Sequence, residues 1–521
     1  MFQNLVSNCQ IVNEQCSKKG MEYRMKLNDC ISVPRLEPAS SLLELSPEQR
    51  SELWAGVHDA IEIYWRKVTE YPVTPKLDPG PIRELLRDAD FSGPIRPSDA
   101  IRLCVEGLTR YQTHTSHPSY FGLFNPRASF MGVMADTLVA AFNPQAGSWS
   151  ASPFAVEVEQ HVLRFFGEQF GLDPRKTHGT FTSGGSEANH TACLTALTHR
   201  FPEFAVQGVR ALRSRPLIYC STEGHHTHHR AARMCGLGAD AIREIPVDRF
   251  LQMNTELLAD QIRKDRKEGH TPFLVIGTAG TTNTGVIDPI AEIAAFAARE
   301  GLWFHLDAAW GGAAVLVPEL RHHFEGVHLA DSITLDAHKW LSVPMAAGLY
   351  LTRHADILEK TFRIDTPYVP QDTDRLDVVE PYQNSMQWSR RLIGLKVFLS
   401  LAVAGREGYA AVLRYQTRMG ALLRERLQEA GWKIVNQTPL PVVCFTEAEV
   451  SETPNDYLAG IAREVLASGK AWISITRLSG NRPVLRACVT NYKTSARDVD
   501  DLVKTLTEAR TKLRRLHGMP S

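Results

Sequence analysis

The 521-residue sequence has no excess of charge of either sign, because 58 Lys and Arg side chains balance 58 Asp and Glu side chains. Proteins that bind nucleic acid or anionic membranes through their overall charge carry a basic surplus, so we expect neither partner. No apolar run approaches the roughly 20 residues that cross a bilayer. The first thirty residues also lack the apolar core of a secretory signal. We therefore expect a cytoplasmic protein without a membrane partner.

Cysteines are few, and their spacing is uninformative. The nine are scattered along the chain, and none forms a Cys-x-x-Cys pair with another. An odd number without metal-ligand spacing is typical of reduced thiols in a cytosolic protein, so we expect neither a disulfide framework nor a metal site. The chain is long enough for two or three domains.

Apolar runs alternate with helical patterns between residues 100 and 365. The expected strands are Pro216–Cys220, Phe273–Gly277, Trp303–Leu306, Ser332–Leu335 and Gly348–Thr352, and the expected helices include Ser186–Arg200 and Pro289–Glu300. This alternation predicts an α/β domain with a largely parallel sheet. In the N-terminal part, Ser46, Pro47 and Gln49 predict the capped start of a helix.

The C-terminal part reads as a smaller α+β domain. It is expected to contain a helix starting near Gln387–Ala404, helices at Ala411–Ala430 and Ala496–Leu516, and strands at Pro441–Phe445, Ala471–Ile475 and Val484–Val489. The predicted division is a first segment at 1–100, irregular and then helical, a large domain at 101–385 and a small domain at 386–521.

Lys339 and Asp307 each stand at the end of an expected strand. Lys339 lies in Asp336-Ala337-His338-Lys339-Trp340, and a Schiff base with a carbonyl cofactor removes the cost of burying its ammonium. Asp307 ends the apolar run Trp303–Leu306, and a buried carboxylate needs a charged partner. Pyridoxal phosphate (PLP) requires a lysine for its aldehyde and an acid for its pyridinium nitrogen. The alternatives for Asp307 are a helix cap and an internal salt bridge.

Three further segments fit a PLP site. Gly184, Gly185 and Ser186 begin an expected helix, and glycines at a helix N-terminus accommodate a phosphate. The alternative is an ordinary helix start with a flexible turn. Thr282 lies in a hydroxyl-rich loop after the strand Phe273–Gly277, and alone this loop reads as a plain strand-to-loop transition.

His225 follows the strand Pro216–Cys220, where ligands gather in open α/β sheets. Its imidazole is suited to stacking on a pyridine ring. The alternatives are a solvated turn and a metal site, because His225 and His229 have i, i+4 spacing. No Glu completes a His-Glu-x-x-His pattern. The conjunction of all five segments in a workable order favours the PLP site over each local alternative.

Asp307-Ala308-Ala309 together with His338-Lys339-Trp340 resembles the group II PLP-dependent amino acid decarboxylases, over roughly residues 50–510. This family includes aromatic amino acid, glutamate and cysteine sulfinate decarboxylases. The resemblance implies PLP fold type I, with a large domain around a mostly parallel seven-stranded sheet and a small α+β domain. It also implies a homodimer with shared active sites.

The resemblance also assigns roles to single residues. It implies that Lys339 forms the Schiff base, Asp307 pairs with the pyridinium, His225 stacks on the ring, Gly185 and Ser186 bind the phosphate, and Thr282, Ala309 and His338 contact the cofactor. Asp336 falls where many members carry a phosphate-binding Asn, and an ionised Asp repels a phosphate.

The reaction implied is decarboxylation of an L-amino acid. Phe362–Tyr368 resembles the start of the family's mobile catalytic loop, in which the residue at Tyr368 donates a proton to the substrate α-carbon. Members that lack a proton donor there form aldehydes oxidatively, so retention of Tyr368 and His225 favours simple decarboxylation. The alternatives are an aldehyde synthase, another PLP-dependent lyase or carbon–carbon bond-forming enzyme, and a non-catalytic scaffold.

The expected substrate is non-aromatic or polar. The resemblance places His117–Arg127 along the substrate pocket and brings Ala146, Gly147 and Ser148 to it from the partner subunit. Leu123, Asn125, Ala146 and Ser148 make this pocket more open and polar than that of aromatic decarboxylases. Arg127 is suited to gripping a distal acid group, and a structural role for it is an equal alternative.

Overall fold

The computed structural model describes residues 43–87, 89–364, 376–447, 455–478 and 481–516. The chain forms two units, one of Met1–Trp65 with Glu84–Gly107 and the other of Arg66–Arg83 with Leu108–Ser521. The helices at the N-terminal end are α2 (Pro47–Lys67), α3 (Pro79–Arg87) and α4 (Pro97–Arg110). Among the described residues, no helix is both long and apolar enough to span a bilayer.

The predicted start of α2 is confirmed. The N–H of Gln49 donates to Ser46 Oγ at 3.2 Å, and the N–H of Ser46 donates to Gln49 Oε1 at 2.9 Å. These two bonds satisfy backbone donors that the first helical turn leaves open.

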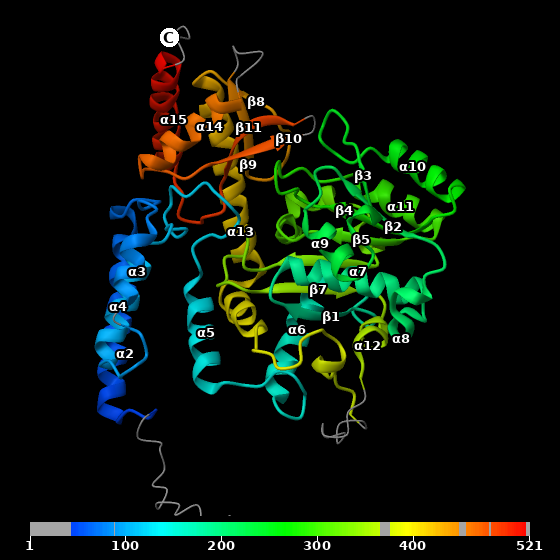
Figure 1. Ribbon diagram of the computed structural model, residues 1–521, viewed down its shortest axis with the longest axis horizontal. Coiled ribbons are helices and arrows are strands. Elements are labelled where there is room, and N and C mark those ends of the chain that lie inside the picture. Colours follow the sequence, from blue (N-terminus) through cyan, green and yellow to red (C-terminus); the bar gives the residue numbers. More distant parts are fainter. Residues whose placement is uncertain (1–42, 88, 365–375, 448–454, 479–480, 517–521) are drawn as a thin grey trace, which may run out of the picture. The chain divides into compact units, whose positions relative to one another are not determined.

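The larger sheet has seven strands in the order β1-β7-β6-β5-β4-β2-β3 (Figure 1). Their bounds are His178–Thr182 (β1), Pro216–Ser221 (β2), Ile242–Ile245 (β3), Thr271–Thr278 (β4), Trp303–Asp307 (β5), Ser332–Asp336 (β6) and Gly348–Thr352 (β7). Strand β7 runs antiparallel to β1 and β6, whereas neighbours from β6 to β3 are parallel. The prediction of an α/β domain with a mostly parallel seven-stranded sheet is confirmed.

Helices cover both faces of this sheet. Alternate residues of a strand point to opposite faces. Tyr219 and Val275 pack in a core with α6 (Pro153–Gln169), α10 (Thr255–Lys267) and α11 (Ile290–Glu300). Ile218 and Ile276 pack instead with α7 (Gly185–Arg200) and α9 (Thr227–Met234). Burial on both faces explains why these strands read as continuous apolar runs rather than alternating ones.

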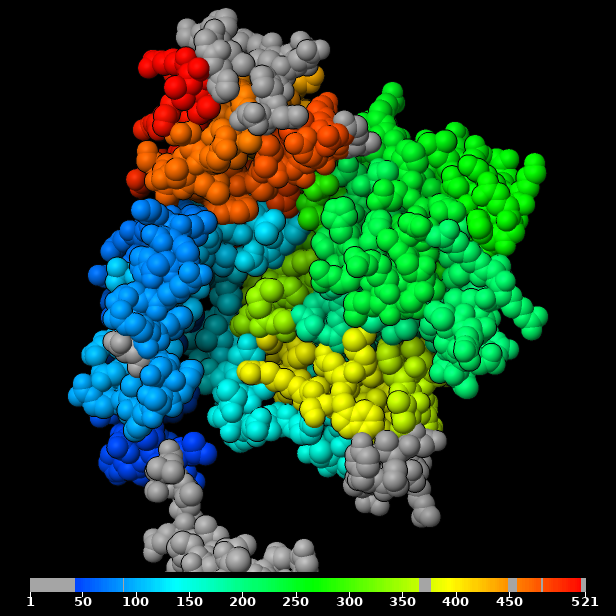
Figure 2. Space-filling model, viewed as in Figure 1, coloured from blue at the N-terminus to red at the C-terminus, as the bar shows by residue number. Residues whose placement is uncertain are grey.

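The smaller sheet is antiparallel, in the order β10-β11-β9-β8. Its strands are Trp432–Ile434 (β8), Val442–Glu447 (β9), Ser474–Leu478 (β10) and Arg482–Cys488 (β11), and its helices are α14 (Asn455–Ala467) and α15 (Ala496–Leu516). In Figure 2 the orange C-terminal segment forms one lobe and the green central segment forms another. The expected strand Ala471–Ile475 was placed too early, since β10 begins at Ser474.

Helix α13 (Gly394–Glu429) joins the two sheets (Figure 1). It begins later than the expected Gln387–Ala404 and continues through the expected Ala411–Ala430. The backbone leaves the helical conformation at Gly405, where φ is 65°. The helix packs on α5 (Phe130–Phe142) and α6 as well as on α15 and β8. The predicted domain boundaries at 100 and 385 stay predictions.

Two shorter helices, α8 (Phe204–Gln207) and α12 (Ile357–Phe362), also contact α7.

Candidate active site

One small cavity, of about 120 Å³, brings together most of the residues singled out in the sequence. The predicted residues that line it are Gly185, Ser186, His225, Thr282, Asp307, Ala309, Asp336 and Lys339. His338 is buried next to it, where its Nδ1 accepts the N–H of Ala347 at 3.0 Å. Tyr368 lies outside the described residues.

The sheet topology explains this convergence. Thr278, Asp307 and Asp336 are the last residues of β4, β5 and β6. Thr278 and Asp307 are direct neighbours in the parallel register of β4 and β5. The carboxyl ends of parallel strands meet at one edge, where open α/β sheets bind ligands.

The start of α7 forms a narrow cradle. A Cβ added to Gly185 would lie 2.8 Å from Asp336 Oδ2 and 3.2 Å from the Ala309 Cβ, so a side chain at position 185 does not fit. The first N–H groups of a helix have no partner within it and carry positive partial charge. This end of α7 therefore offers donors to an anion that approaches closely.

Asp307 is a buried carboxylate with partners on both oxygens. Oδ1 accepts the N–H of Ala309 at 3.1 Å, and Oδ2 accepts Nδ2–H of Asn189 at 2.9 Å. Nε2 of buried His228 lies 3.1 Å from Oδ2. Burial alone raises the pKa of Asp307, but the contact with His228 and the charge of Lys339 outweigh it and hold this pKa well below the usual range. Asp307 is therefore an anion at neutral pH.

His225 lies at the solvent-exposed mouth of the cavity. Its Nδ1 lies 2.9 Å from Thr227 Oγ1 and accepts the N–H of Thr227 at 3.2 Å. The protein atoms around the ring lower the pKa of His225, and the charge of Asp307 opposes this effect. His229, the second member of the possible metal pair, lies 3.3 Å from Glu244 Oε1 instead. The two histidines therefore contact different partners, Thr227 for His225 and Glu244 for His229.

Lys339 forms an ion pair with Asp336, since Nζ lies 3.0 Å from Asp336 Oδ2. Asp336 is only 2% exposed, and its other oxygen, Oδ1, has no hydrogen-bond partner among the described residues. A buried oxygen without a partner is unfavourable. The Asp336 carboxylate therefore lies between Lys339 and the start of α7, with Oδ2 paired and Oδ1 unpaired among the described residues.

Three residues that line the cavity each carry a buried polar atom with no hydrogen-bond partner among the described residues. These atoms are Thr278 Oγ1, Trp310 Nε1 and Asp336 Oδ1. Most buried polar atoms in proteins are hydrogen-bonded, so a cluster of orphaned ones indicates a missing ligand. A lysine, an ionised carboxylate, an exposed imidazole and an anion cradle around these atoms fit PLP. Of the two acidic side chains that line the cavity, Asp336 is the one that lies against Gly185, where its charge opposes a phosphate.

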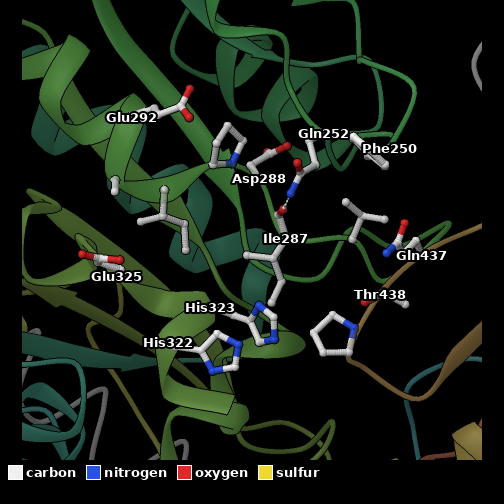
Figure 3. Close-up of a pocket in the computed structure, with 15 residues that line it drawn as sticks. Phe250, Gln252, Ile287, Asp288, Glu292, His322, His323, Glu325, Gln437 and Thr438 are labelled. Carbon is white, nitrogen blue, oxygen red and sulfur yellow. Dashed lines mark hydrogen bonds between the residues drawn. The ribbon is translucent and has the colours of Figure 1, made fainter. Parts of the chain in front are cut away.

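A larger pocket, of about 560 Å³, lies elsewhere and contrasts with this cavity (Figure 3). Two of its polar side chains are engaged: Asp288 accepts the N–H groups of Met253 and Thr278, both at 2.8 Å, and Gln252 donates to Ile287 O at 2.7 Å. None of its described lining side chains carries an orphaned buried atom. The chemistry therefore points to the smaller cavity.

The cavity also contains residues that sequence reasoning missed: Asn189, Thr227, Thr278, Gly280 and Trp310. Asn189 was detectable, because it lies one helical turn after Gly185 and so faces the same side of α7. Thr227 was detectable only once His225 was placed. Nothing in the sequence marks Trp310 apart from its position after Asp307.

The segment expected to line the substrate pocket is anchored in the smaller sheet. The N–H of Phe121 donates to Trp472 O, and the N–H of Cys488 donates to Phe121 O, both at 2.9 Å. Phe124 stacks on Trp310, with ring centroids 4.4 Å apart. Through Trp310, which lines the cavity, this segment reaches the candidate site.

Comparisons with known proteins agree with this site. The model of the pyridoxal-dependent decarboxylase conserved domain matches residues 84–447. The aromatic-L-amino-acid decarboxylase of Bacillus atrophaeus is 29% identical over 470 residues, which cover 88% of this chain and 95% of that protein. The L-aspartate decarboxylase dtxS4 of Metarhizium robertsii is 28% identical over 350 residues, covering 67% and 70%.

Solved structures share the fold. The crystal structure of Oryza sativa TDC with PLP and tryptamine superposes with a TM-score of 0.85 at 24% identity, covering 90% of this chain and 99% of that one.

Proposed function

The chain belongs to the pyridoxal-dependent decarboxylase family, and on that premise we propose that it converts a non-aromatic or polar L-amino acid to the amine and carbon dioxide. The family makes it a carboxy-lyase of PLP fold type I whose cofactor is pyridoxal 5′-phosphate. The observation that carries the proposal is the convergence of Lys339, Asp307 and His225 on one cavity at the start of α7.

The residues of the cavity divide the work of holding the cofactor. Lys339 would hold its aldehyde, Asp307 its ring nitrogen, His225 its ring face, and Gly185 and Ser186 its phosphate. Further residues around the cofactor would be Thr282, Ala309, His338 and Asp336. The bound cofactor supplies an electron sink for the pair of electrons that remains when carbon dioxide leaves.

Asp307 contributes a fixed negative charge. Because its pKa lies well below the usual range, it stays ionised throughout the neutral range and can hold a proton on a ring nitrogen. Lys339, a proton donor and nucleophile, begins from an ion pair with Asp336 at 3.0 Å. Trp310, which lines the cavity, is only 2% exposed, so this side of the site is shielded from solvent. Exclusion of water there strengthens each of these charge interactions.

We assign the return of a proton to the substrate α-carbon to Tyr368. The support is the resemblance of Phe362–Tyr368 to the family's catalytic loop. A phenol near the reacting carbon acts as a general acid, and such a group accelerates a reaction by roughly 10²–10⁴-fold.

The proposal of a polar substrate rests on the segment that contains Leu123 and Asn125. Leu123 is 51% exposed, so it does not belong to the packed core. Asn125 accepts the Tyr120 hydroxyl at 3.2 Å through its oxygen, which leaves the amide N–H groups as the donors that a polar substrate would meet. The relative named an L-aspartate decarboxylase supports a polar substrate, and the aromatic-L-amino-acid decarboxylase supports the aromatic alternative.

We further propose that the protein acts as a homodimer. Helix α5 exposes Phe130, Met134, Leu138 and Phe142, which follow one another at four-residue spacing along one face. Phe142 is 82% exposed. A continuous apolar stripe of this kind marks an interaction surface, and a second copy of the chain would cover it. Light scattering should give twice the 58.2 kDa mass, and a monomer at micromolar concentration would contradict this proposal.

The test of the reaction is a panel of L-amino acids incubated with the PLP-loaded protein, with and without oxygen. We expect one polar substrate to yield amine and carbon dioxide in equal amounts, independently of oxygen. Mass spectrometry identifies the product, and Lys339→Ala is the inactive control. Formation of aldehyde and hydrogen peroxide would contradict simple decarboxylation and indicate an oxidative reaction. Turnover of aromatic substrates alone would contradict the proposed substrate class.

A further inference from the structure

Asn189 links the two side chains expected on either side of the cofactor ring. It is 3% exposed and stands on α7, one turn after Gly185. Its Nδ2 donates to Asp307 Oδ2 at 2.9 Å and to Thr227 Oγ1 at 3.0 Å. Thr227 Oγ1 in turn lies 2.9 Å from Nδ1 of His225. A single amide group thus reaches both Asp307 and His225.

The chemistry of the neighbours fixes the orientation of this amide. A carboxylate accepts hydrogen bonds and has none to give, so the NH₂ end of Asn189 must face Asp307. Oδ1 of Asn189 then faces Nε2 of His305 at 3.1 Å and accepts the Thr334 hydroxyl at 2.9 Å. Because that oxygen only accepts, Nε2 of His305 must carry the hydrogen.

The hydrogen bonds beyond His305, to Ser332 and Trp303, are consistent with this orientation of the Asn189 amide. Burial lowers the pKa of His305 to about 3, so the ring is neutral and its Nδ1 is an acceptor. The Ser332 hydroxyl, 2.8 Å from Nδ1, therefore donates to it. Ser332 Oγ accepts from Trp303 Nε1 at 2.9 Å, and an indole N–H only donates. Every bond from Trp303 to Asp307 thus points the same way, an arrangement in which each bond strengthens the next.

The second N–H of Asn189 fixes the other side chain. Since Thr227 Oγ1 accepts from Asn189, its own hydrogen is free to donate to Nδ1 of His225. The Thr227 backbone N–H also donates to Nδ1, at 3.2 Å. Nδ1 therefore accepts two bonds, and the neutral ring carries its hydrogen on Nε2.

We propose that Asn189 is a positioning residue that orients both ring-facing groups at once. One N–H holds the carboxylate of Asp307, and the other, through Thr227, holds His225 as the Nε2–H tautomer. The proposal rests on the assignment of this cavity to PLP and is independent of which amino acid is the substrate.

The test compares PLP-loaded wild type with Asn189→Leu, which keeps the volume and removes the amide. We expect the PLP dissociation constant of the variant to rise about tenfold or more, as for loss of a hydrogen bond to a charged group. We also expect the pH at which the visible absorption band titrates to shift. Asn189→Asp, which keeps the shape but turns a carboxylate toward Asp307, should weaken PLP binding at neutral pH and serves as the second variant where Leu does not fold.

Thr227→Val separates the two arms, because it leaves the bond from Asn189 to Asp307 intact. Nitrogen NMR of histidine-labelled holoenzyme, with His225→Gln to assign the signal, should show the Nε2–H form of His225 in wild type and its loss in Thr227→Val and Asn189→Leu. The control is Thr195→Val on the same helix, whose buried hydroxyl lies 2.7 Å from the Tyr350 hydroxyl outside the cavity. It should leave both readouts unchanged.

A folded Asn189→Leu protein that binds PLP within twofold of wild type, with an unchanged band titration, would overturn the Asp307 arm. An unaltered His225 signal in both variants would overturn the His225 arm. Wild-type protein that forms no visible band with PLP would instead contradict the cofactor assignment itself, so the two failures are distinguishable.

Discussion

Neutralising either of two carboxylates in the same cavity should change PLP affinity in opposite directions. Asp336 lies 3.0 Å from Lys339 Nζ and against Gly185, where the phosphate is expected. Asp336→Asn removes a negative charge next to that phosphate and frees the lysine from its ion pair. Asp307→Asn removes the partner of the ring nitrogen. We expect tighter binding in the first variant and weaker binding in the second.

The size of the first effect follows from Coulomb's law. Two unit charges about 6 Å apart interact by roughly 3 kcal/mol at an effective dielectric constant of about 20. Lys339 offsets part of this repulsion, so a net gain of about 1.4 kcal/mol, or tenfold in affinity, is a reasonable expectation for Asp336→Asn. Loss of a charge-assisted hydrogen bond costs about 1.5–3 kcal/mol, so Asp307→Asn should bind PLP roughly 10- to 150-fold more weakly.

The assay is a titration of PLP-free protein with PLP, followed by visible absorbance at pH 8. The difference between wild type and Asp336→Asn should shrink only slightly at high salt, because buried charges are poorly screened. Equal or weaker binding by Asp336→Asn would refute the reasoning and would mean that Asp336 has a favourable contact with the bound cofactor.

Three further outcomes are expected. Lys339→Ala should abolish both turnover and the visible band of the PLP-loaded protein, and a retained band would refute its role. Gly185→Ala should weaken PLP binding at least tenfold because the new Cβ would lie 2.8 Å from Asp336 Oδ2, whereas Gly56→Ala, on open helix surface, should bind normally and stabilise the fold by up to about 1 kcal/mol. Burial raises the pKa of Asp288 to about 6, so between about pH 4 and 6 the folded state holds a proton that the unfolded state has lost, and stability should fall as the pH rises. The urea midpoint of Asp288→Asn should change less with pH over this range than that of the wild type. An equal change in both proteins would contradict this.

The sequence predicts the strand ends of the site well, and there is a physical reason for this. Strands β2, β4, β5, β6 and β7 are buried on both faces, so their sequences are short apolar runs with clear ends. The polar residue at each end, such as Asp307 or Asp336, therefore stands out. The lysine and glycine motifs lie beside those ends, so the sequence alone is enough to predict that they share a cavity.

The remainder depends on contacts between distant parts of the chain. Asn189 and His305 are 116 positions apart, yet they share a hydrogen bond, and neither looks unusual in its own segment. His228 reads as one of several polar turn residues until its contact with Asp307 is seen. Strand β10 is short and half exposed, so its pattern is weak and the expected strand was shifted by three residues. Tyr368 lies outside the described residues, and its role stays a prediction.

The anchoring of Phe121 in the smaller sheet has a consequence for protein engineering. The groups assigned to the cofactor belong to the larger sheet and its helices, whereas the segment assigned to the substrate is held by backbone bonds to Trp472 and Cys488. Libraries confined to residues 117–127, with Phe124 kept because it stacks on the cavity residue Trp310, would therefore vary the segment assigned to the substrate without changing the groups assigned to the cofactor. Exchange of the C-terminal lobe between relatives would vary the same segment on a larger scale. Two contacts should then be preserved: Asn436 donates to Thr284 O at 2.7 Å, and Gln416 accepts the Trp340 indole N–H at 2.9 Å.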